Sequence, residues 1–374
     1  MTAQISRKIS VSLALVVFGI LFALLLLEIG VRVWFSARGS EQDRVRYLYS
    51  REEIDSQTAQ LVGAPYLNYT LNPAAEDVNV RGVRGEMVAI PKPDNVFRII
   101  TLGGSTTYGH GLTVDEAYPT QLQRILREEY GYTSVEVVNL GVPGYASLDS
   151  LVQLATRGLA HEPDLILVYD GLNDAVVRMF QDPACYNGDS PLTGMGLDRG
   201  IWQYASEDLP ASTLYRFVAI NAGWMADPAI FTYRLDKTGY CPPEPGNISP
   251  LDLLTANPPV YLERNLRSMA AMGIAAGARV VFSTFAWDSA AAEAQLAADS
   301  SLTQARAMLT AIEEQNALMR TLAGELGVPL VDLAVTMGEG AWYQGDQVHM
   351  NADGTRRQAA IYAAALDTLG WVER

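Results

Sequence analysis

Histidine, cysteine and basic residues are scarce in this 374-residue sequence. It has three histidines and two cysteines, and its 27 Lys and Arg residues face 42 Asp and Glu residues, which gives a net charge of −15. Nucleic acid binds to a dense basic face, so this charge balance and the lack of a long Lys/Arg run argue against a nucleic-acid partner. Hydrophobic residues make up 49% of the chain and charged residues 18%, which is typical of a packed globular protein.

The two cysteines, Cys185 and Cys241, limit the structures that cysteine chemistry could support. Two cysteines are too few for a disulfide scaffold, and their spacing is not that of a metal-binding knuckle. Two alternatives stay open: one disulfide, if the domain lies in an oxidising compartment, or two unrelated buried thiols.

A long hydrophobic run lies near the N-terminus. Val11–Phe35 is nearly continuous Leu, Val, Ile, Ala and Phe, and its interior charges are Glu28 and Arg32. A helix needs about 20 apolar residues to cross a bilayer, so the run predicts a transmembrane helix within a membrane anchor of residues 1–38. A cleaved signal peptide is the alternative, but its apolar core would be only about 7–15 residues long.

Basic residues flank this anchor on both sides. Arg7 and Lys8 precede the run and favour a cytoplasmic N-terminus, whereas Arg38, Arg44 and Arg46 follow it. We therefore predict a single-pass membrane protein whose remaining chain lies on the extracytoplasmic side, either periplasmic or extracellular.

Short β-rich runs alternate with helical patterns after residue 96. The β-rich runs are Phe97–Leu102, Val135–Leu140, Asp164–Tyr169, Ala278–Phe285 and Val328–Leu333. The helical stretches are Ala117–Tyr130, Ser147–His161, Pro259–Ala276, Leu302–Leu326 and Ala352–Leu369. Alternation of this kind predicts parallel strands joined by right-handed crossovers, and continuously apolar strands predict a sheet covered on both faces. The predicted fold class is therefore α/β, a three-layer α/β/α sandwich around a parallel sheet of about five strands.

Two segments do not follow this alternation. Residues 39–95 lack strong periodicity and are interpreted as a juxtamembrane connector that packs on the following domain, 96–374.

Within that domain, an irregular insertion at about 179–258 is rich in Pro, Gly, Tyr and Trp. Because it follows the third β-rich run, it is expected near the carboxyl ends of the strands, where ligands bind in open α/β sheets. We interpret it as a candidate for substrate selection, with a structural excursion that packs on the connector as the alternative. Its aromatic residues would either stack on sugar rings or form a core; they are Trp202, Tyr204, Tyr215, Trp224 and Tyr233.

The three histidines restrict where acid–base chemistry can occur. His161 ends a predicted helix, and His110 lies in the loop after the first β-rich run, close to any site there. His349 lies three residues after Asp346, and a carboxylate beside a histidine fixes its tautomer and stabilises the imidazolium formed in catalysis. Alone, this Asp-x-x-His pair also fits a surface turn or half of a metal site.

A glycine-rich turn follows directly after the first β-rich run. Its residues Gly103 and Gly104 permit a sharp turn that places the Ser105 hydroxyl at the edge of the sheet. Such a turn could hold a phosphate instead. It lacks, however, the Gly-Lys-Ser/Thr ending of a P-loop and the Gly-x-Gly-x-x-Gly spacing of a dinucleotide site.

The next two β-rich runs also end in residues that can supply hydrogen-bond donors. Asn173 follows the third run, and its amide can donate to a developing oxyanion. The second run ends with Asn139 and Leu140 and leads to Gly141 and Gly144, where a glycine lets a backbone amide approach the same point. Singly, each of these residues fits an ordinary strand-end turn.

Together these blocks resemble the SGNH hydrolase family, also called GDSL-like esterases and lipases. The family is named after one serine, one glycine, one asparagine and one histidine, and the matching residues are Ser105, Gly144, Asn173 and His349. Gly144 matches better than Gly141, because the family's block places its glycine five residues after an asparagine, here Asn139. Asp346 matches the acid of the family's Asp-x-x-His block.

This resemblance implies a flavodoxin-like sheet and makes 96–374 a catalytic domain with neither a metal nor an organic cofactor. The implied catalytic triad is Ser105, His349 and Asp346. The implied oxyanion hole consists of the amides of Ser105 and Gly144 and the side chain of Asn173. One departure is that Gly104 stands where the family's Gly-Asp-Ser signature has its aspartate, which weakens any inference that the substrate is a lipid.

The sequence therefore predicts a membrane-anchored serine esterase that hydrolyses O-acyl esters. O-acetyl groups on cell-envelope or extracellular glycans are the first candidate substrate. An O-acetyltransferase of envelope polymers would use the same residues but exclude water, and a lipase or lysophospholipase would act on longer acyl chains. A non-catalytic binding module would keep the fold alone, and the complete set of site residues argues against it.

Overall fold

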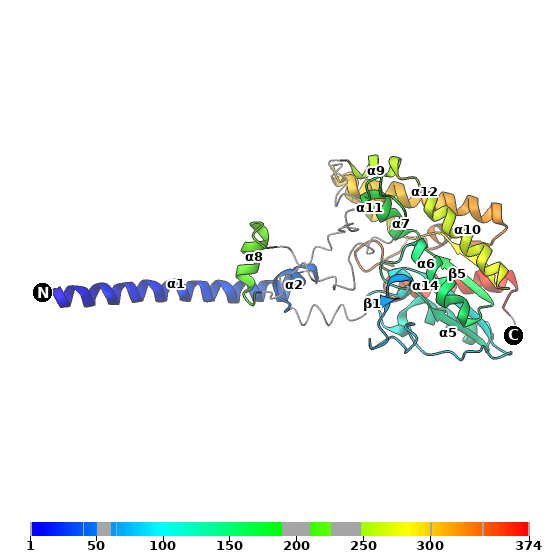
Figure 1. Cartoon of the computed structure of the whole chain (residues 1–374), viewed down its shortest axis with the longest axis horizontal. Helices are drawn as coiled ribbons and strands as arrows, with labels where there is room; N and C mark the ends of the chain where they lie inside the picture. Colours follow the sequence, from blue (N-terminus) through cyan, green and yellow to red (C-terminus); the bar gives the residue numbers. More distant parts are fainter. Residues whose placement is uncertain are drawn as a thin grey trace. The chain divides into compact units, whose positions relative to one another are not determined.

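The computed structural model describes residues 2–39, 41–50, 61–64, 66–188, 210–225, 248–299, 301–338 and 340–372. The chain divides into two compact units (Figure 1). The N-terminal unit comprises Met1–Ala59 and Asp198–Thr232, and the sheet unit comprises Gln60–Leu197 and Tyr233–Arg374. The chain therefore passes from one unit to the other three times, twice within the predicted insertion.

The N-terminal unit is helical in its described residues. It contains α1 (Thr2–Arg38), α2 (Glu41–Tyr47) and α8 (Thr213–Asn221). The segment Leu13–Arg38 of α1 has a mean hydropathy of 2.7 in its most apolar window, and its side chains in that window are not buried. By length and composition, α1 is thus a helix that can cross a membrane.

The sheet unit is built on five parallel strands. They are β3 (Phe97–Gly103), β4 (Val135–Asn139), β5 (Leu165–Tyr169), β6 (Arg279–Ser283) and β7 (Leu330–Val331). Their order across the sheet is β4-β3-β5-β6-β7, and each neighbouring pair runs parallel. In the register, Ile99 lies opposite Val137 on one side and opposite Leu165 on the other. The predicted parallel sheet of about five strands is confirmed.

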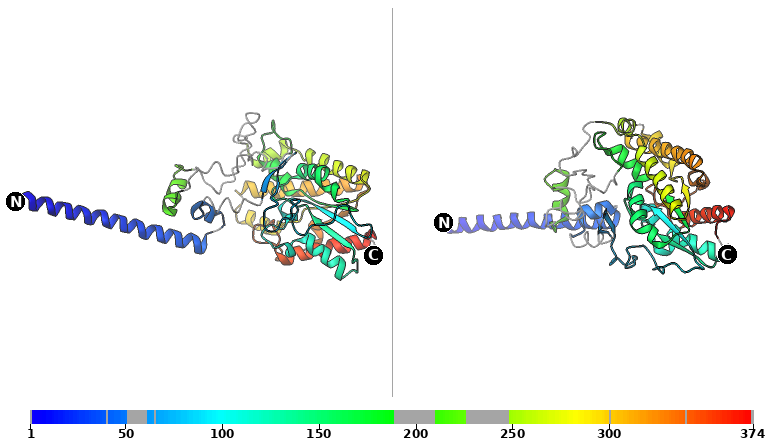
Figure 2. Two further views of the ribbon diagram at one scale, coloured as in Figure 1. Left: turned by 60° about the horizontal axis from the view of Figure 1, so that its bottom comes forward. Right: turned by 45° about the vertical axis from the view of Figure 1, so that its right-hand side comes forward.

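Helices cover both faces of this sheet (Figure 2). They include α5 (Tyr118–Glu128), α6 (Ser147–Gln153), α7 (Leu172–Phe180), α9 (Pro250–Ala256), α10 (Val260–Ala275), α12 (Thr303–Leu326) and α14 (Ala352–Leu369). Shorter or peripheral elements are α4 (Ser105–Tyr108), α11 (Ser289–Ala298), α13 (Leu333–Thr336) and a 3-10 helix at Val114–Glu116.

Successive strand residues enter two different cores, because side chains of a strand alternate between its faces. Leu165 and Leu167 of β5 belong to the core formed with α5 and α14. Ile166 and Val168 belong to the core formed with α10 and the second half of α12. Burial on both faces explains why β5 is continuously apolar in sequence. The predicted three-layer α/β/α sandwich is confirmed.

The helix predicted at Ser147–His161 is not regular. It consists of α6, a π-helical turn at Leu154–Gly158 and a 3-10 turn at Leu159–His161. At Gly158 a Cβ would lie 3.1 Å from Leu154 Cδ1 and 3.4 Å from Ile100 Cδ1, so this turn packs tightly on β3. The predicted helical stretch is confirmed, and it changes from α to π to 3-10 geometry along its length.

The predicted connector, 39–95, contributes to both units. Its first part contains α2, and its second part forms an antiparallel hairpin of β1 (Leu61–Ala64) and β2 (Leu67–Leu71) in the sheet unit. Tyr69 and Leu71 of β2 are fully buried in a small core with Tyr145.

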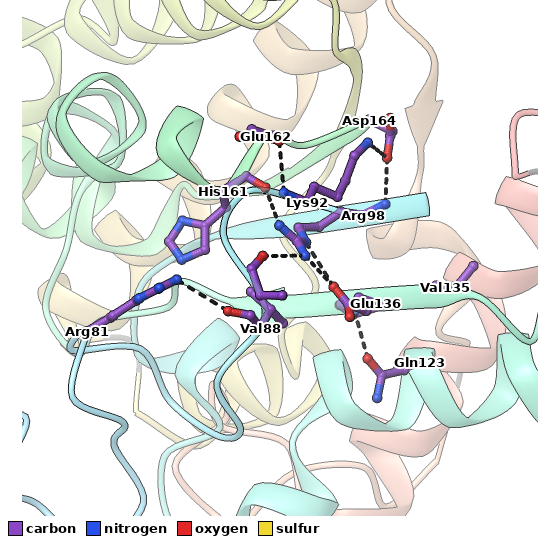
Figure 3. A network of polar contacts seen from close by, with 12 residues as sticks. Arg81, Val88, Lys92, Arg98, Gln123, Val135, Glu136, His161, Glu162 and Asp164 are labelled. Atoms are coloured by element: carbon purple, nitrogen blue, oxygen red, sulfur yellow. Dashed lines mark hydrogen bonds and ion pairs between the residues drawn. The ribbon is translucent and has the colours of Figure 1, made fainter. Parts of the chain in front are cut away.

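A buried arginine joins strands β3 and β4 near their N-terminal ends (Figure 3). The Arg98 side chain is 0% exposed, and its Nη2 donates to Glu136 Oε2 at 2.6 Å and to the carbonyl of Ala89 at 2.9 Å. Its Nη1 donates to the carbonyl of His161 at 2.7 Å, and its backbone N–H donates to Asp164 Oδ2 at 2.7 Å. These partners satisfy a charge that would otherwise be costly to bury.

Replacing Arg98 with methionine should lower the free energy of unfolding by about 3 kcal/mol, since the Glu136 carboxylate and two carbonyls lose their donor. Arg267→Met is the matched control, because Arg267 is 40% exposed where it pairs with Glu263 and Glu325. It should cost less than about 1 kcal/mol. Denaturant unfolding of the full chain in detergent measures both values, and equal losses would contradict the assignment.

Candidate active site

The turn after β3 places Ser105 at the carboxyl end of the sheet. Gly103 ends the strand, Gly104 follows it, and Ser105 is the first residue of α4. At Gly103 a Cβ would lie closer than 3.0 Å to both the Thr107 side chain and the carbonyl of Tyr169, the last residue of β5. A glycine at this position therefore lets the serine turn lie directly against the neighbouring strand end.

Ser105, His349 and Asp346 form a continuous chain of hydrogen bonds. The Ser105 Oγ lies 2.8 Å from His349 Nε2, and His349 Nδ1 lies 2.5 Å from Asp346 Oδ2. A carboxylate can only accept, so the ring carries its proton on Nδ1 and donates it to Asp346, while Nε2 accepts from the Ser105 hydroxyl. This arrangement makes the imidazole a base directed at the serine.

The Asp346 carboxyl group is held in its ionised form. Burial alone raises the pKa of Asp346, but hydrogen bonds from the His349 ring, the His349 N–H and the Val348 N–H lower it by more. The net result is a pKa well below the usual range of an aspartate. The carboxylate is therefore available to orient the ring throughout the neutral and mildly acidic range.

Backbone contacts fix the loop that carries His349. The Gln344 side chain donates to the carbonyls of His110 and Met350, each at 2.8 Å, and its backbone N–H donates to the carbonyl of His349 at 2.8 Å. Asn351, two residues after His349, caps α14, because its side chain accepts a hydrogen bond from the Gly354 N–H at 2.9 Å. The histidine is thus held between a loop after β3 and the start of a helix.

Asn173 and Gly144, the other two residues singled out in the sequence, lie next to each other. Asn173 is in the first turn of α7, and its Nδ2 donates to the carbonyl of Tyr145 at 2.8 Å. Gly144 precedes Tyr145 and has a φ of +81°, a conformation that favours glycine. Ser105 and Asn173 line the same small pocket, together with Tyr145.

The substitution of the signature aspartate by Gly104 has a local physical consequence. A Cβ at this position would lie 2.9 Å from Asn173 Nδ2 and 3.1 Å from the Tyr145 carbonyl. Any side chain at residue 104 would therefore push on the hydrogen bond that orients the Asn173 amide.

Two tyrosines that the sequence did not single out fix the loop at Gly144. The Tyr69 hydroxyl of β2 donates to the Pro143 carbonyl at 3.0 Å, and the Tyr145 hydroxyl donates to the Tyr69 carbonyl at 2.6 Å. Their rings pack edge to face at 5.3 Å. Because these residues are more than 70 positions apart, no local sequence signal indicates the contact.

A buried acid also joins the loop after β4 to the start of α7. The Asp174 carboxylate accepts from the Ser147 N–H at 3.0 Å and from the Ser147 hydroxyl at 2.5 Å. Burial raises the pKa of Asp174, and burial together with Asp174 raises the pKa of the neighbouring Asp170. These contacts hold Asn173 beside the Gly144 loop.

The other two histidines have different surroundings. The His110 ring lies 4.9 Å from the His349 ring, and burial and His349 lower its pKa, so it stays neutral beside the hydrogen-bonded chain. His161 is buried, and its Nδ1 lies 3.0 Å from the carbonyl of Arg157. His110 therefore lines the site, and His161 belongs to the helix end beneath Arg98.

Cys185 forms a disulfide bond, which excludes the alternative of a free thiol at this position. Cys241, the other cysteine of the sequence, lies outside the described residues, as do Trp202, Tyr204 and Tyr233 of the insertion. In the described part of the chain, no three His, Cys, Asp or Glu side chains are grouped as ligands for a metal ion.

The close approach of the loop after β4 to α4 yields a stability prediction. At Gly141 a Cβ would lie 2.6 Å from Thr107 C and 2.8 Å from Tyr108 Cα, and closer still to the Tyr108 nitrogen. Because these are backbone atoms, Gly141→Ala must move α4 and the turn that carries Ser105. We expect a loss of about 2 kcal/mol or more, in the range of overpacking in a core.

Gly324→Ala is the matched control for this measurement. Gly324 lies within α12, and a Cβ there meets no atom within 4 Å. Alanine should therefore stabilise the helix by roughly 0.5–1 kcal/mol. Thermal unfolding of the two variants should shift in opposite directions, and a Gly141→Ala protein as stable as the parent would refute the close-packing argument.

Comparison with known proteins assigns the chain to a family. The GDSL-like lipase/acylhydrolase family matches residues 101–357, which include Ser105, Gly144, Asn173, Asp346 and His349. Solved structures of similar architecture include a lipase/acylhydrolase from Enterococcus faecalis, with 15% identity, a TM-score of 0.43 and coverage of 73% of this chain and 97% of that one. A GDSL-like lipase from Bacteroides thetaiotaomicron has 14% identity, a TM-score of 0.41 and coverage of 75% and 93%.

An acetyl xylan esterase has 16% identity, a TM-score of 0.40 and coverage of 72% and 100%. The comparison with curated proteins gave no match. The family match spans more than half of the sequence and every residue of the hydrogen-bonded site. The chain belongs to the GDSL-like lipase/acylhydrolase family and is a serine hydrolase that acts on carboxylic ester bonds.

Proposed function

We propose that the protein is a membrane-anchored serine esterase that removes O-acetyl groups from cell-envelope or extracellular glycans. Ser105 is the nucleophile, His349 is the general base, and Asp346 orients the ring. The observation that carries this proposal is the 2.8 Å hydrogen bond between Ser105 Oγ and His349 Nε2, continued by the 2.5 Å hydrogen bond to Asp346.

In the proposed reaction, His349 Nε2 takes the proton of Ser105 as Oγ attacks the ester carbonyl. The oxyanion of the tetrahedral intermediate accepts hydrogen bonds from the amides of Ser105 and Gly144 and from Asn173 Nδ2. One hydrogen of the Asn173 amide donates to Tyr145, which leaves its second hydrogen for the oxyanion. His349 then gives its proton to the leaving alcohol, and water activated by the same ring releases the carboxylate and regenerates Ser105.

Among the described residues, two small cavities flank Ser105, one beside Asn173 and one beside His349 and His110. The short acyl group of the proposed substrate is placed in the cavity beside Asn173, next to the proposed oxyanion donors. The Asp346 side chain is 51% exposed, so a bulky alcohol such as a glycan can remain in solvent on the histidine side.

Two features support an anchored, extracytoplasmic enzyme. The Leu13–Arg38 segment of α1 is long and apolar enough to cross a membrane, and Arg7 and Lys8 before it favour a cytoplasmic N-terminus. The disulfide of Cys185 fits an oxidising compartment, since such bonds are rare in the cytosol.

Ser105→Ala should abolish hydrolysis of 4-nitrophenyl acetate and labelling by a fluorophosphonate probe, because no other group replaces the nucleophile. Ser268→Ala is the matched control: Ser268 is a partly exposed residue of α10 whose hydroxyl donates to the Arg264 carbonyl at 2.8 Å. Steady-state assay and in-gel fluorescence measure both. Undiminished labelling of the Ser105 variant would remove the assigned nucleophile.

Asp346→Asn should lower kcat by about 10⁴, as expected when an amide cannot hold the proton of the ring on Nδ1. KM should change little, because Asp346 is oriented toward the ring and not toward the acyl pocket. The initial rate with 4-nitrophenyl acetate across substrate concentrations separates the two constants. A decrease confined to KM would show that Asp346 binds substrate instead.

A panel of esters distinguishes the proposed activity from the related ones. Cleavage should be fastest for acetyl esters and fall steeply for octanoyl and longer chains, since the proposed substrate carries a short acyl group. With an acetyl donor and an oligosaccharide acceptor, free acetate should be the main product by mass spectrometry. A preference for long acyl chains would favour a lipase, and an acetylated acceptor would favour a transferase.

A further inference from the structure

Helix α8 of the insertion is attached to the hydrophobic helix α1 through a carboxylate. Glu28 Oε1 accepts from the Thr213 N–H at 2.9 Å, and Glu28 Oε2 accepts from the Leu214 N–H at 2.9 Å and from the Ser212 hydroxyl at 2.8 Å. Arg32 pairs with Glu28 at 3.1 Å and donates to the Ala211 carbonyl at 2.6 Å. The negative side chain thus satisfies the first N–H groups of α8.

A second set of contacts holds the middle of α8. Phe217 packs on Phe35 of α1 at 5.9 Å and on Tyr47 of α2 at 5.5 Å between ring centroids. The side chain of Arg216 is buried, and it donates to the carbonyls of Pro210 and Tyr49, each at 2.6 Å. Figure 1 shows α8 beside the C-terminal half of α1, where these contacts are made.

The position of Glu28 along α1 coincides with the end of its apolar stretch. A helix rises about 1.5 Å per residue, so Ile9–Leu27 extends over about 28 Å, close to the roughly 30 Å of a hydrocarbon core. Glu28 would then lie at the boundary between acyl chains and headgroups. A bare carboxylate is costly at that depth, and the N-terminus of α8 and Arg32 provide the partners that lower this cost.

The side of α8 turned away from these contacts is aromatic and apolar. Tyr215 is 50% exposed, Val218 44%, and Trp224, just beyond the helix, 74%. Trp224 is held in place by its N–H, which donates to the Ala219 carbonyl at 2.8 Å. The charged residue of α8, Arg216, is buried, so this exposed surface carries no charge from the helix. Exposed apolar surfaces mark interaction sites. Trp and Tyr are enriched at membrane–water interfaces, where their amphipathic rings lie at the level of the headgroups.

We infer that α8 is a second membrane contact, an interfacial helix whose Tyr215, Val218 and Trp224 side chains enter the headgroup–acyl boundary of a lipid bilayer beside α1. The inference rests on the proposed role of α1 as a membrane anchor. A bilayer is the occupant that the observations favour, because α8 is bonded to α1 at Glu28, directly after the apolar stretch, and the nearby α1 residues Ile29 and Val33 are exposed as well. The insertion thereby attaches the chain to the membrane at a point other than its N-terminal helix.

Depth-dependent fluorescence quenching tests this inference in the full chain. Trp224→Cys is labelled with nitrobenzoxadiazole maleimide, with Tyr215→Cys as a second variant, and the native Cys185 disulfide stays intact. The protein is reconstituted into phosphatidylcholine/phosphatidylglycerol vesicles with a nitroxide at either a shallow or a deep acyl position. Val335→Cys, on a residue of the sheet unit that is 66% exposed, is the aqueous control. Leu24→Cys within α1 is the membrane control.

We expect the shallow nitroxide to quench the label at 224 or 215 several-fold more than the label at 335. The additional change Glu28→Gln should reduce quenching at 224 without changing it at 24, because α8 loses its anionic partner. Quenching of both α8 labels by aqueous iodide as efficient as at 335 would overturn the inference. A blue-shifted label that no lipid nitroxide quenches would also overturn it, because protein would then cover α8. An unquenched label at 24 would instead reject the anchoring proposal.

Discussion

The hydrogen bond between the Ser105 hydroxyl and the His349 ring joins residues 244 positions apart, and the rest of the site is arranged around it. A proton can move between these groups only if two loops meet within hydrogen-bond distance. Polar contacts to the backbone secure that meeting. The Thr355 hydroxyl of α14 donates to the Glu116 carbonyl at 2.6 Å, and Gln344 bonds to the His110 carbonyl. The start of α14 is thus tied directly to the segment that follows the serine turn.

Close approach of main chains imposes the second constraint on the site. Gly103 and Gly141 allow the ends of β5 and β4 to lie against α4, with no room for a Cβ at either residue. Asn173 and Gly144 then come together beside Ser105, because the three strands that lead to them are neighbours in the sheet. Glycine at residue 104 fits the same geometry, since a side chain there would press on the Asn173 amide. The departure from the family's signature is therefore compatible with the proposed oxyanion hole.

These features differ in how far the sequence could predict them. Strand β5 is buried at every residue and is apolar throughout, so its sequence indicated a sheet covered on both faces. Short motifs at the strand ends identified the polar residues of the candidate site. Tyr69 could not be found in this way, because its partners Pro143 and Tyr145 are 74 and 76 residues away. Helix α9 was missed although its N-terminal signals are local: Ser249 accepts from the Asp252 N–H, and Pro250 is the first helical residue.

The contact between Glu28 of α1 and the start of α8 could not be predicted from the sequence. In sequence Glu28 only interrupts the hydrophobic segment, and its partner could not be predicted, because Thr213 and Leu214 lie about 185 residues further along the chain. Near a bilayer boundary, hydrogen-bond donors lower the free-energy cost of an ionised carboxylate. The N–H groups in the first turn of a helix have no acceptor within the helix and can act as such donors. The pairing therefore stabilises both partners, since the carboxylate is solvated and α8 is capped. Helix α8 of the insertion is bonded to α1, and the role of the insertion in substrate selection stays a prediction.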